Sequence, residues 1–182
     1  MSAPDFNELP SPSSLPERRA AQSVDADWNP VNPPVIEGVR IVDVKNVVIR
    51  GGTLTEIYRE EWFGDTMPVR HLTHVTSLPG YASQWHCHHV QADIVFPIRG
   101  YFRIGLYDAR QDSPTRGKSI VSTFHILRPR YVYVPPGVWH ALRNVGPDEG
   151  AYLVLNDTEY NYENPDDWTL PPGAEEIPVR LD

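Results

Sequence analysis

The chain is poor in cysteine, in methionine and in long apolar runs. It has one cysteine and two methionines among 182 residues. The single cysteine, Cys87, excludes a disulfide within the chain and favours a reducing, cytoplasmic setting. No apolar run approaches the roughly 20 residues that a membrane-spanning helix needs, so we expect no membrane partner. The N-terminus also lacks the basic start and apolar middle of a secretory signal.

Clustered positive charge is missing as well. Lys and Arg number 16 against 24 Asp and Glu, which gives a formal net charge of −8. Proteins bind nucleic acid phosphates through clustered Lys and Arg, so this composition argues against nucleic acid as a partner. The length suits one domain with a substantial core.

Proline divides the chain into three parts. Residues 1–36 contain seven prolines with Ser, Asn and Asp between them, which predicts an extended arm. Residues 37–160 alternate short β-rich runs with turn sequences, without a convincing helical period, and this predicts an all-β antiparallel sandwich or barrel. Residues 161–182 are again proline-rich, and we expect this tail to pack on the barrel through Trp168.

Nine runs have the character of strands, because they are short, rich in β-branched and aromatic residues, and bounded by turn residues. They are residues 39–50, 53–58, 71–78, 92–98, 101–108, 120–127, 131–134, 138–145 and 151–157.

Three of the seven histidines fall within four positions of the stretch GYASQWHCHHVQADIVFPIRG. On a strand, His86 and His88 point to one face and Cys87 to the other. Asp93 begins the next expected strand, and His140 begins another after a Pro-Gly turn. Three imidazoles and one carboxylate suit a divalent transition metal, which for this set is Mn, Fe, Co, Ni, Cu or Zn. We therefore predict one such ion on His86, His88, Asp93 and His140.

Simpler interpretations stay open for several of these residues. Asp93 could hydrogen-bond a ligating histidine instead of binding the metal, and without metal the histidines would serve as polar contacts. His89 is expected to point away from His86 and His88. His71 and His74 lie on opposite strand faces, so at most one of them can face the pocket.

Charged residues elsewhere have structural interpretations. Asp108 and Arg110 are expected to form an ion pair at a strand end. The acidic tail residues are expected to be a solvated surface; they are Asp166, Asp167, Glu175 and Glu176.

Two motifs resemble those of a known superfamily. Gly80-x5-His86-x-His88-x4-Asp93-x6-Gly100 resembles the first cupin motif, with aspartate in place of the usual glutamate. Pro135-x-Gly137-x2-His140-x3-Asn144 resembles the second cupin motif. The resemblance implies a double-stranded β-helix, or jelly-roll barrel, with the metal inside it.

A narrower resemblance rests on GGTLTEIYREEW, QADIVFPIRG, YDARQDSPTRG, VPPGVWHAL and NDTEY. These segments resemble the dTDP-4-dehydrorhamnose 3,5-epimerases and their relatives. Members of that family are cupins, usually dimers with exchanged N-terminal strands. They epimerise a keto-sugar by removing a proton next to its carbonyl, without metal. The resemblance implies a homodimer and a small-molecule substrate.

The sequence departs from this family at working positions. The family's histidine base falls on His86, but its lysine falls on Asp93 and its phosphate-gripping arginine on Ser83. Its proton-donating tyrosine falls near Val154. Tyr152 lies two residues earlier on the same strand face, so we predict Tyr152 as a catalytic residue in its place.

The predicted activity is isomerisation or epimerisation of a hydroxy-carbonyl compound, sugar-derived if the frame reflects its ancestry. A metal could stabilise the enediolate in place of the missing lysine, with Tyr152 or metal-bound hydroxide moving the proton. Arg103 shares strand parity with Tyr101 and Tyr107, and it is the basic residue expected to meet an anionic substrate. The alternatives are a metal-dependent dioxygenase and a non-catalytic barrel that binds a small ligand.

Overall fold

The computed structural model describes residues 20–63 and 67–182, so most of the predicted arm lies outside the described residues. The chain divides into two units, one up to Pro33 and one from Pro34 to Asp182. In the first unit, Asp25 accepts hydrogen bonds from the backbone N–H groups of Asp27 and Asn29, which forms a turn. Ile36 is 1% exposed and packs in the core of the second unit, so the barrel begins before the predicted boundary at residue 37.

The second unit is built almost entirely of strands. They are β1 (Arg40–Asp43), β2 (Asn46–Ile49), β3 (Gly52–Thr55), β4 (His71–Ser77), β5 (Trp85–Cys87), β6 (Asp93–Arg99), β7 (Tyr101–Asp108), β8 (Ser119–His125), β9 (Arg130–Val134), β10 (Val138–Asn144), β11 (Gly150–Asn156) and β12 (Trp168–Leu170). One short 3-10 helix, η1, covers Glu60–Trp62. In the described residues no helix is both long and apolar enough to span a membrane.

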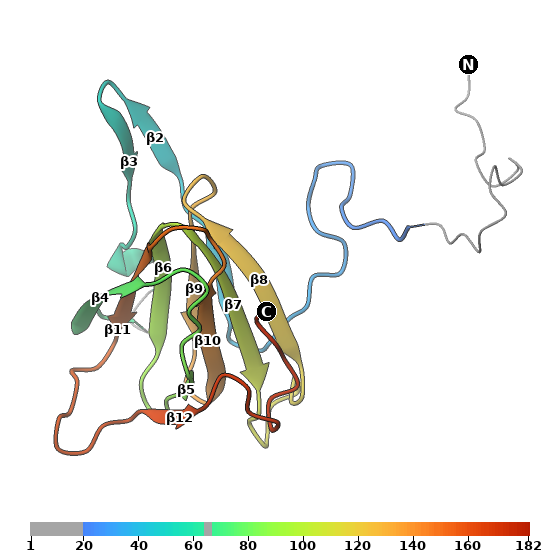
Figure 1. Cartoon of the computed structure of the whole chain (residues 1–182), viewed down its shortest axis with the longest axis vertical. Helices are drawn as coiled ribbons and strands as arrows, with labels where there is room; N and C mark the ends of the chain where they lie inside the picture. The colour runs from blue at the N-terminus through green and yellow to red at the C-terminus, as the bar shows by residue number, and fades with distance from the viewer. Residues whose placement is uncertain (1–19, 64–66) are drawn as a thin grey trace, which may run out of the picture. The chain divides into compact units, whose positions relative to one another are not determined.

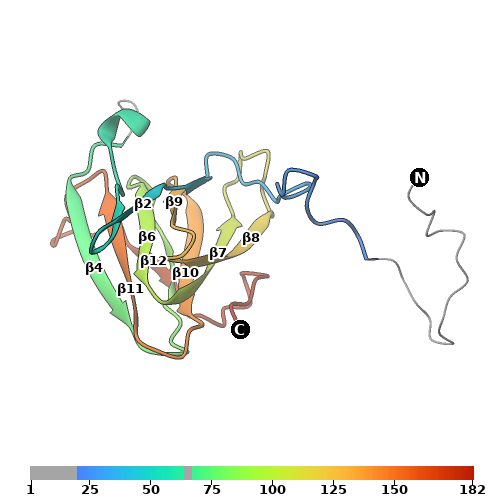
Figure 2. The same cartoon turned by 90° about the horizontal axis from the view of Figure 1, so that it is seen from above.

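The strands form two antiparallel sheets of five. One sheet has the order β1-β9-β6-β11-β4 and the other β12-β5-β10-β7-β8, while β2 and β3 pair as a separate hairpin. In Figure 1 this hairpin projects from the barrel, and Figure 2 shows the two sheets face to face. The predicted all-β jelly-roll architecture is confirmed. The short strand β12 was not expected from the sequence.

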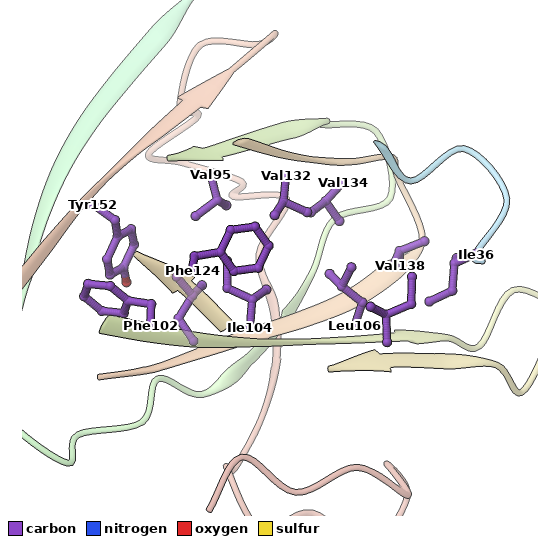
Figure 3. Packing of buried hydrophobic residues seen from close by; sticks show 12 residues of the cluster. Ile36, Val95, Phe102, Ile104, Leu106, Phe124, Val132, Val134, Val138 and Tyr152 are labelled. Atoms are coloured by element: carbon purple, nitrogen blue, oxygen red, sulfur yellow. The ribbon is translucent and has the colours of Figure 1, made fainter. Parts of the chain in front are cut away.

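The main core fills the space between the sheets. Strand alternation sends every second side chain inward, and Figure 3 shows these side chains meeting. Val95, Val132 and Val134 come from the first sheet, and Phe102, Ile104, Leu106, Phe124 and Val138 come from the second. Phe102 meets Tyr152 edge to face at 5.2 Å between ring centroids, a favourable geometry for aromatic pairs.

The outer face of the second sheet is also covered. Ile177, Val179 and Leu181 from the tail pack there against Trp85, and all four are buried. Gly105 on β7 lies so close beneath them that an added Cβ would come within 2.7 Å of Leu181 and Trp85. Residues of the tail therefore contact the barrel through these aliphatic side chains. Trp168 is half-exposed and stacks on His89.

A buried carboxylate at the end of β7 organises the loop that follows it. Asp108 is fully buried and accepts hydrogen bonds from the Arg110 guanidinium at 2.9 Å and from the hydroxyls of Ser113 and Thr115. The predicted ion pair is confirmed. Burial alone would raise the pKa of Asp108, but the bonds from Arg110, Ser113 and Thr115 lower it below its usual value.

We expect Asp108→Asn to lower the free energy of unfolding by about 2 to 4 kcal/mol, because Arg110 loses its carboxylate partner and keeps only neutral acceptors. The folded-state pKa of Asp108 is depressed, so its stabilising contribution is complete above the unfolded pKa of roughly 4 and is lost as pH falls below it. Urea unfolding at several pH values checks this. The difference between wild type and variant should shrink as pH falls from about 5 to 2, and a constant difference would contradict the assignment.

Candidate active site

A pocket of about 280 Å³ lies between the two sheets at the end where β6 begins and β11 ends. Its walls come from β4, β5, β6, β10 and β11 and from the segment between β11 and β12. The lining residues are His71, Thr73, Val75, Ser83, His86, His88, Gln91, Asp93, Val95, His140, Leu142, Tyr152, Val154, Asn156, Tyr160 and Asp167.

Strand register places the polar residues of this pocket in two facing rows. In the first sheet, Asp93 pairs with Asn156, and Asn156 pairs with His71. In the second sheet, His140 pairs with His86. Since residues paired across neighbouring strands point to the same face, these side chains gather at one level of the barrel.

Three of the four predicted metal ligands converge on one point. The Nε2 atom of His88 lies 3.3 Å from Oδ2 of Asp93, and the Nε2 atom of His140 lies 3.2 Å from the same oxygen. The three potential ligand atoms lie within 4.8 Å of one another, and each residue is buried or nearly so. We call His88, Asp93 and His140 the central cluster.

Backbone carbonyls fix the orientation of both imidazoles in the central cluster. The Nδ1 atom of His140 lies 3.1 Å from the carbonyl oxygen of Val138, and the Nδ1 atom of His88 contacts that of Asp166. A carbonyl oxygen only accepts, so each Nδ1 carries the proton and donates it. In the neutral imidazoles, Nε2 is then unprotonated and carries a lone pair. Two lone pairs aimed at a carboxylate require a cation between them, either a proton or a metal ion.

The other oxygen of Asp93 is held by two amides. Its Oδ1 accepts from Nε2 of Gln91 at 2.9 Å and from Nδ2 of Asn156 at 2.7 Å, which turns Oδ2 toward the histidines. Burial would raise the pKa of Asp93, but hydrogen bonds from His140 and His88 bring it well below its usual range. For His88 the effects have the opposite signs. Burial by itself lowers the pKa of the imidazole, but the hydrogen bond to Asp93 outweighs burial and raises the pKa to about 9.

His86, the fourth predicted ligand, lies in the pocket wall but outside the central cluster. Its Nδ1 atom is 2.9 Å from Oδ1 of Asp167, and its side chain is one-third exposed. A carboxylate only accepts, so Nδ1 of His86 donates and its Nε2 is the lone pair. This arrangement leaves a proton acceptor beside the central cluster.

The structure corrects the prediction for Arg103. The guanidinium of Arg103 contacts the backbone carbonyls of Leu181 and Asp182, and Arg103 does not line the pocket in the described residues. Its strand neighbours Phe102 and Ile104 face the core. The face shared by Arg103 and Gly105 is therefore the outer one, which the tail covers.

Tyr152 does line the pocket, but in a different place from the polar rows. It lies four residues along β11 from Asn156, which is roughly 13 Å at strand spacing. Burial raises the pKa of the Tyr152 phenol to about 12, so the hydroxyl stays protonated at neutral pH.

Two site residues were missed by sequence reasoning, which placed Asp166 and Asp167 on a solvated surface. Asp167 accepts a hydrogen bond from His86. The Asp166 carboxylate accepts hydrogen bonds of 2.7 to 3.0 Å from the backbone N–H groups of His89, Val90 and Gln91. Burial raises the pKa of Asp166, but these backbone bonds lower it further than burial raises it. The adjacent pair in NPDDW, just before an aromatic residue, was the available signal.

Comparisons with known proteins agree with the fold. A probable low-salt glycan biosynthesis epimerase of Haloferax volcanii is 29% identical over 140 residues, which cover 76% of this chain and 89% of that protein. A dTDP sugar isomerase from Desulfovibrio desulfuricans has a similar structure, with a TM-score of 0.74 at 20% identity, covering 80% of this chain and 92% of the other. No protein-family model matches the chain.

A second solved structure contains a nucleotide. It is a double mutant of a 3'-monoepimerase from Streptomyces bikiniensis in complex with dTDP, with a TM-score of 0.72 at 20% identity over 82% of this chain and 77% of the other. A dTDP-4-dehydrorhamnose 3,5-epimerase from Bacillus anthracis has a similar structure too, with a TM-score of 0.69 at 18% identity over 78% of this chain and 83% of the other. The predicted resemblance to these epimerases is thus confirmed at the level of fold.

We expect Asp166→Ala to loosen residues 89–91, because three backbone N–H groups lose a charged acceptor worth about 1.5 to 3 kcal/mol in all. Amide hydrogen exchange should become at least about ten-fold faster at Val90 and Gln91. Glu163→Ala, an exposed acidic residue on the same segment, is the matched control. Equal exchange in the two variants would contradict this role for Asp166.

Proposed function

We propose that this protein is a sugar epimerase or isomerase that moves a proton on a carbon next to a carbonyl group. The observation that carries the proposal is the His86–Asp167 pair, which presents an imidazole lone pair to the pocket beside the central cluster. Similarity to a probable glycan biosynthesis epimerase and to sugar isomerase structures supports the same reaction class.

His86 is the proposed base. Asp167 accepts a hydrogen bond from Nδ1, so it orients the ring and stabilises the imidazolium that forms when Nε2 takes a proton from the substrate. His86 lies on β5 next to His140 on β10. A substrate whose C–H bond faces His86 would therefore direct its carbonyl oxygen toward the central cluster.

The central cluster is proposed to hold one divalent transition metal. Two Nε2 lone pairs and a carboxylate oxygen form a fitting donor set, and amides and carbonyls orient each ligand from behind. When bound, such an ion would polarise the carbonyl and stabilise negative charge on its oxygen. This is the task of the family's lysine, whose place Asp93 takes here.

Tyr152 is the proposed proton donor. It lies on β11, in the sheet opposite His86, so the two groups can reach opposite faces of a bound sugar. A phenol with a pKa near 12 keeps its proton until the substrate becomes an enolate. Inversion at carbon needs removal of the proton on one face and delivery on the other.

The metal is tested by elemental analysis of untagged protein. We expect close to one transition metal ion per chain in wild type and at least about a 100-fold weaker affinity in His88→Ala, because a ligand is lost. His89→Ala, whose ring stacks on Trp168 outside the pocket, is the control and should keep the metal. Wild type that carries no metal and takes up none of Mn, Fe, Co, Ni, Cu or Zn would refute the proposal.

The reaction is tested with a 4-keto-6-deoxy sugar in deuterated buffer. Wild type should place deuterium next to the carbonyl, and His86→Asn should slow this by about 10²- to 10⁴-fold because the base is gone. His89→Asn is the control. Tyr152→Phe should still exchange the proton but lose inversion, measured by proton NMR of the product. Unchanged exchange in His86→Asn would remove His86 as the base, and unchanged inversion in Tyr152→Phe would remove Tyr152 as the donor.

A further inference from the structure

A groove of about 290 Å³ opens directly beside the pocket. Its outer wall is the segment between β11 and β12, and it shares four wall residues with the pocket: His88, Gln91, Tyr160 and Asp167. A substrate whose reacting sugar occupies the pocket would therefore extend into this groove.

The groove offers neutral hydrogen-bonding groups. Thr158 and Gln91 face each other, with the Thr158 hydroxyl donating to Oε1 of Gln91 at 3.2 Å. Asn161 and Asn164 line the same wall, and Oδ1 of Asn161 accepts a hydrogen bond from the backbone N–H of Asn164. Hydroxyl and amide groups both donate and accept, as the hydroxyls of a carbohydrate do.

The formal charges around the groove are negative. Glu159, Asp166 and Asp167 line it, and Asp93 lines the adjoining pocket. Within residues 20–63 and 67–182, no lysine or arginine lines either hollow. A diphosphate beside these carboxylates would be repelled, and proteins usually grip phosphate oxygens with Arg or Lys.

Protonated histidines would not make the charge around the groove positive. His86 donates to Asp167, and His88 and His140 direct their Nε2 atoms at Asp93. Each imidazole that could become cationic thus already has a carboxylate as its partner.

Tyr160 lies where the two hollows meet. Tyr160 is 41% exposed, and its ring packs edge to face on Tyr162, with ring centroids 4.9 Å apart. An exposed aromatic face at this junction gives the C–H groups of a sugar ring an apolar surface.

We propose that the groove binds an uncharged, hydroxylated extension of the substrate, a second sugar unit of a neutral glycoside, and not a nucleotide diphosphate. The inference rests on the proposed function, because the groove opens from the same pocket. It separates this protein in substrate class from the structurally similar 3'-monoepimerase that was solved with dTDP.

The test compares one 4-keto-6-deoxy sugar in three forms: its methyl glycoside, a disaccharide that carries it at the non-reducing end, and its dTDP-linked form. Solvent deuterium incorporation by the full chain gives kcat/KM for each. We expect the disaccharide to exceed the dTDP-linked form by at least ten-fold. Asn164→Ala should lower kcat/KM for the disaccharide at least five-fold more than for the methyl glycoside. Asn46→Ala, an exposed asparagine on the β2–β3 hairpin, is the matched control.

The outcomes separate this inference from the proposed function. A dTDP-linked sugar that exchanges as well as the disaccharide, or better, would overturn the inference and leave the epimerase proposal standing. An Asn164→Ala variant that affects disaccharide and methyl glycoside alike would also overturn it. Exchange in none of the three compounds would refute the proposed function, and the inference with it.

Discussion

The contact between Asp93 and two imidazoles is the interaction on which the rest of the site depends. A buried carboxylate costs several kcal/mol unless it is paired and hydrogen-bonded. Here His88 and His140 face one oxygen and the amides of Gln91 and Asn156 hold the other. Segments from both sheets therefore meet at one carboxylate, and their register is fixed where the pocket needs it.

The fold shared with sugar epimerases is compatible with the altered residues, because the proposed reaction makes separate demands on a base and on an electrophile. The proposed base, His86, has an orienting carboxylate in Asp167, while Asp93 is negatively charged where the resemblance to the epimerases aligns a lysine. Under the proposed function, electrophilic assistance would come from a metal ion bound by Asp93, instead of from a lysine at that position. Ser83 stands where the resemblance aligns a phosphate-binding arginine. The replacement of this arginine by serine and of the lysine by Asp93 both remove positive charge from the pocket.

Local sequence patterns were sufficient for the barrel and for the central cluster. Strand alternation and turn residues identified β4, β6, β7 and β11 almost to their ends, and the HxH spacing with Asp93 and His140 identified the three converging residues. Parity alone misplaced Arg103, because both faces of its sheet are covered and alternation does not say which face is the inner one. Asp167 was missed because its role comes from the pairing of β12 with β5, a contact between segments far apart in the chain that no local pattern reveals.

The strand β12 has three residues, two of them exposed, so little buried surface holds it against β5. Local opening of such an edge segment costs a small fraction of the free energy of global unfolding, so it occurs while the rest of the barrel stays folded. The segment leading into β12 also carries Asp166 and Asp167. One fraying motion would thus widen the entrance and separate His86 from its carboxylate at the same time. With His86 as the proposed base, molecules would enter and leave while its imidazole is poorly oriented, and the alignment would return only when the edge closes over them.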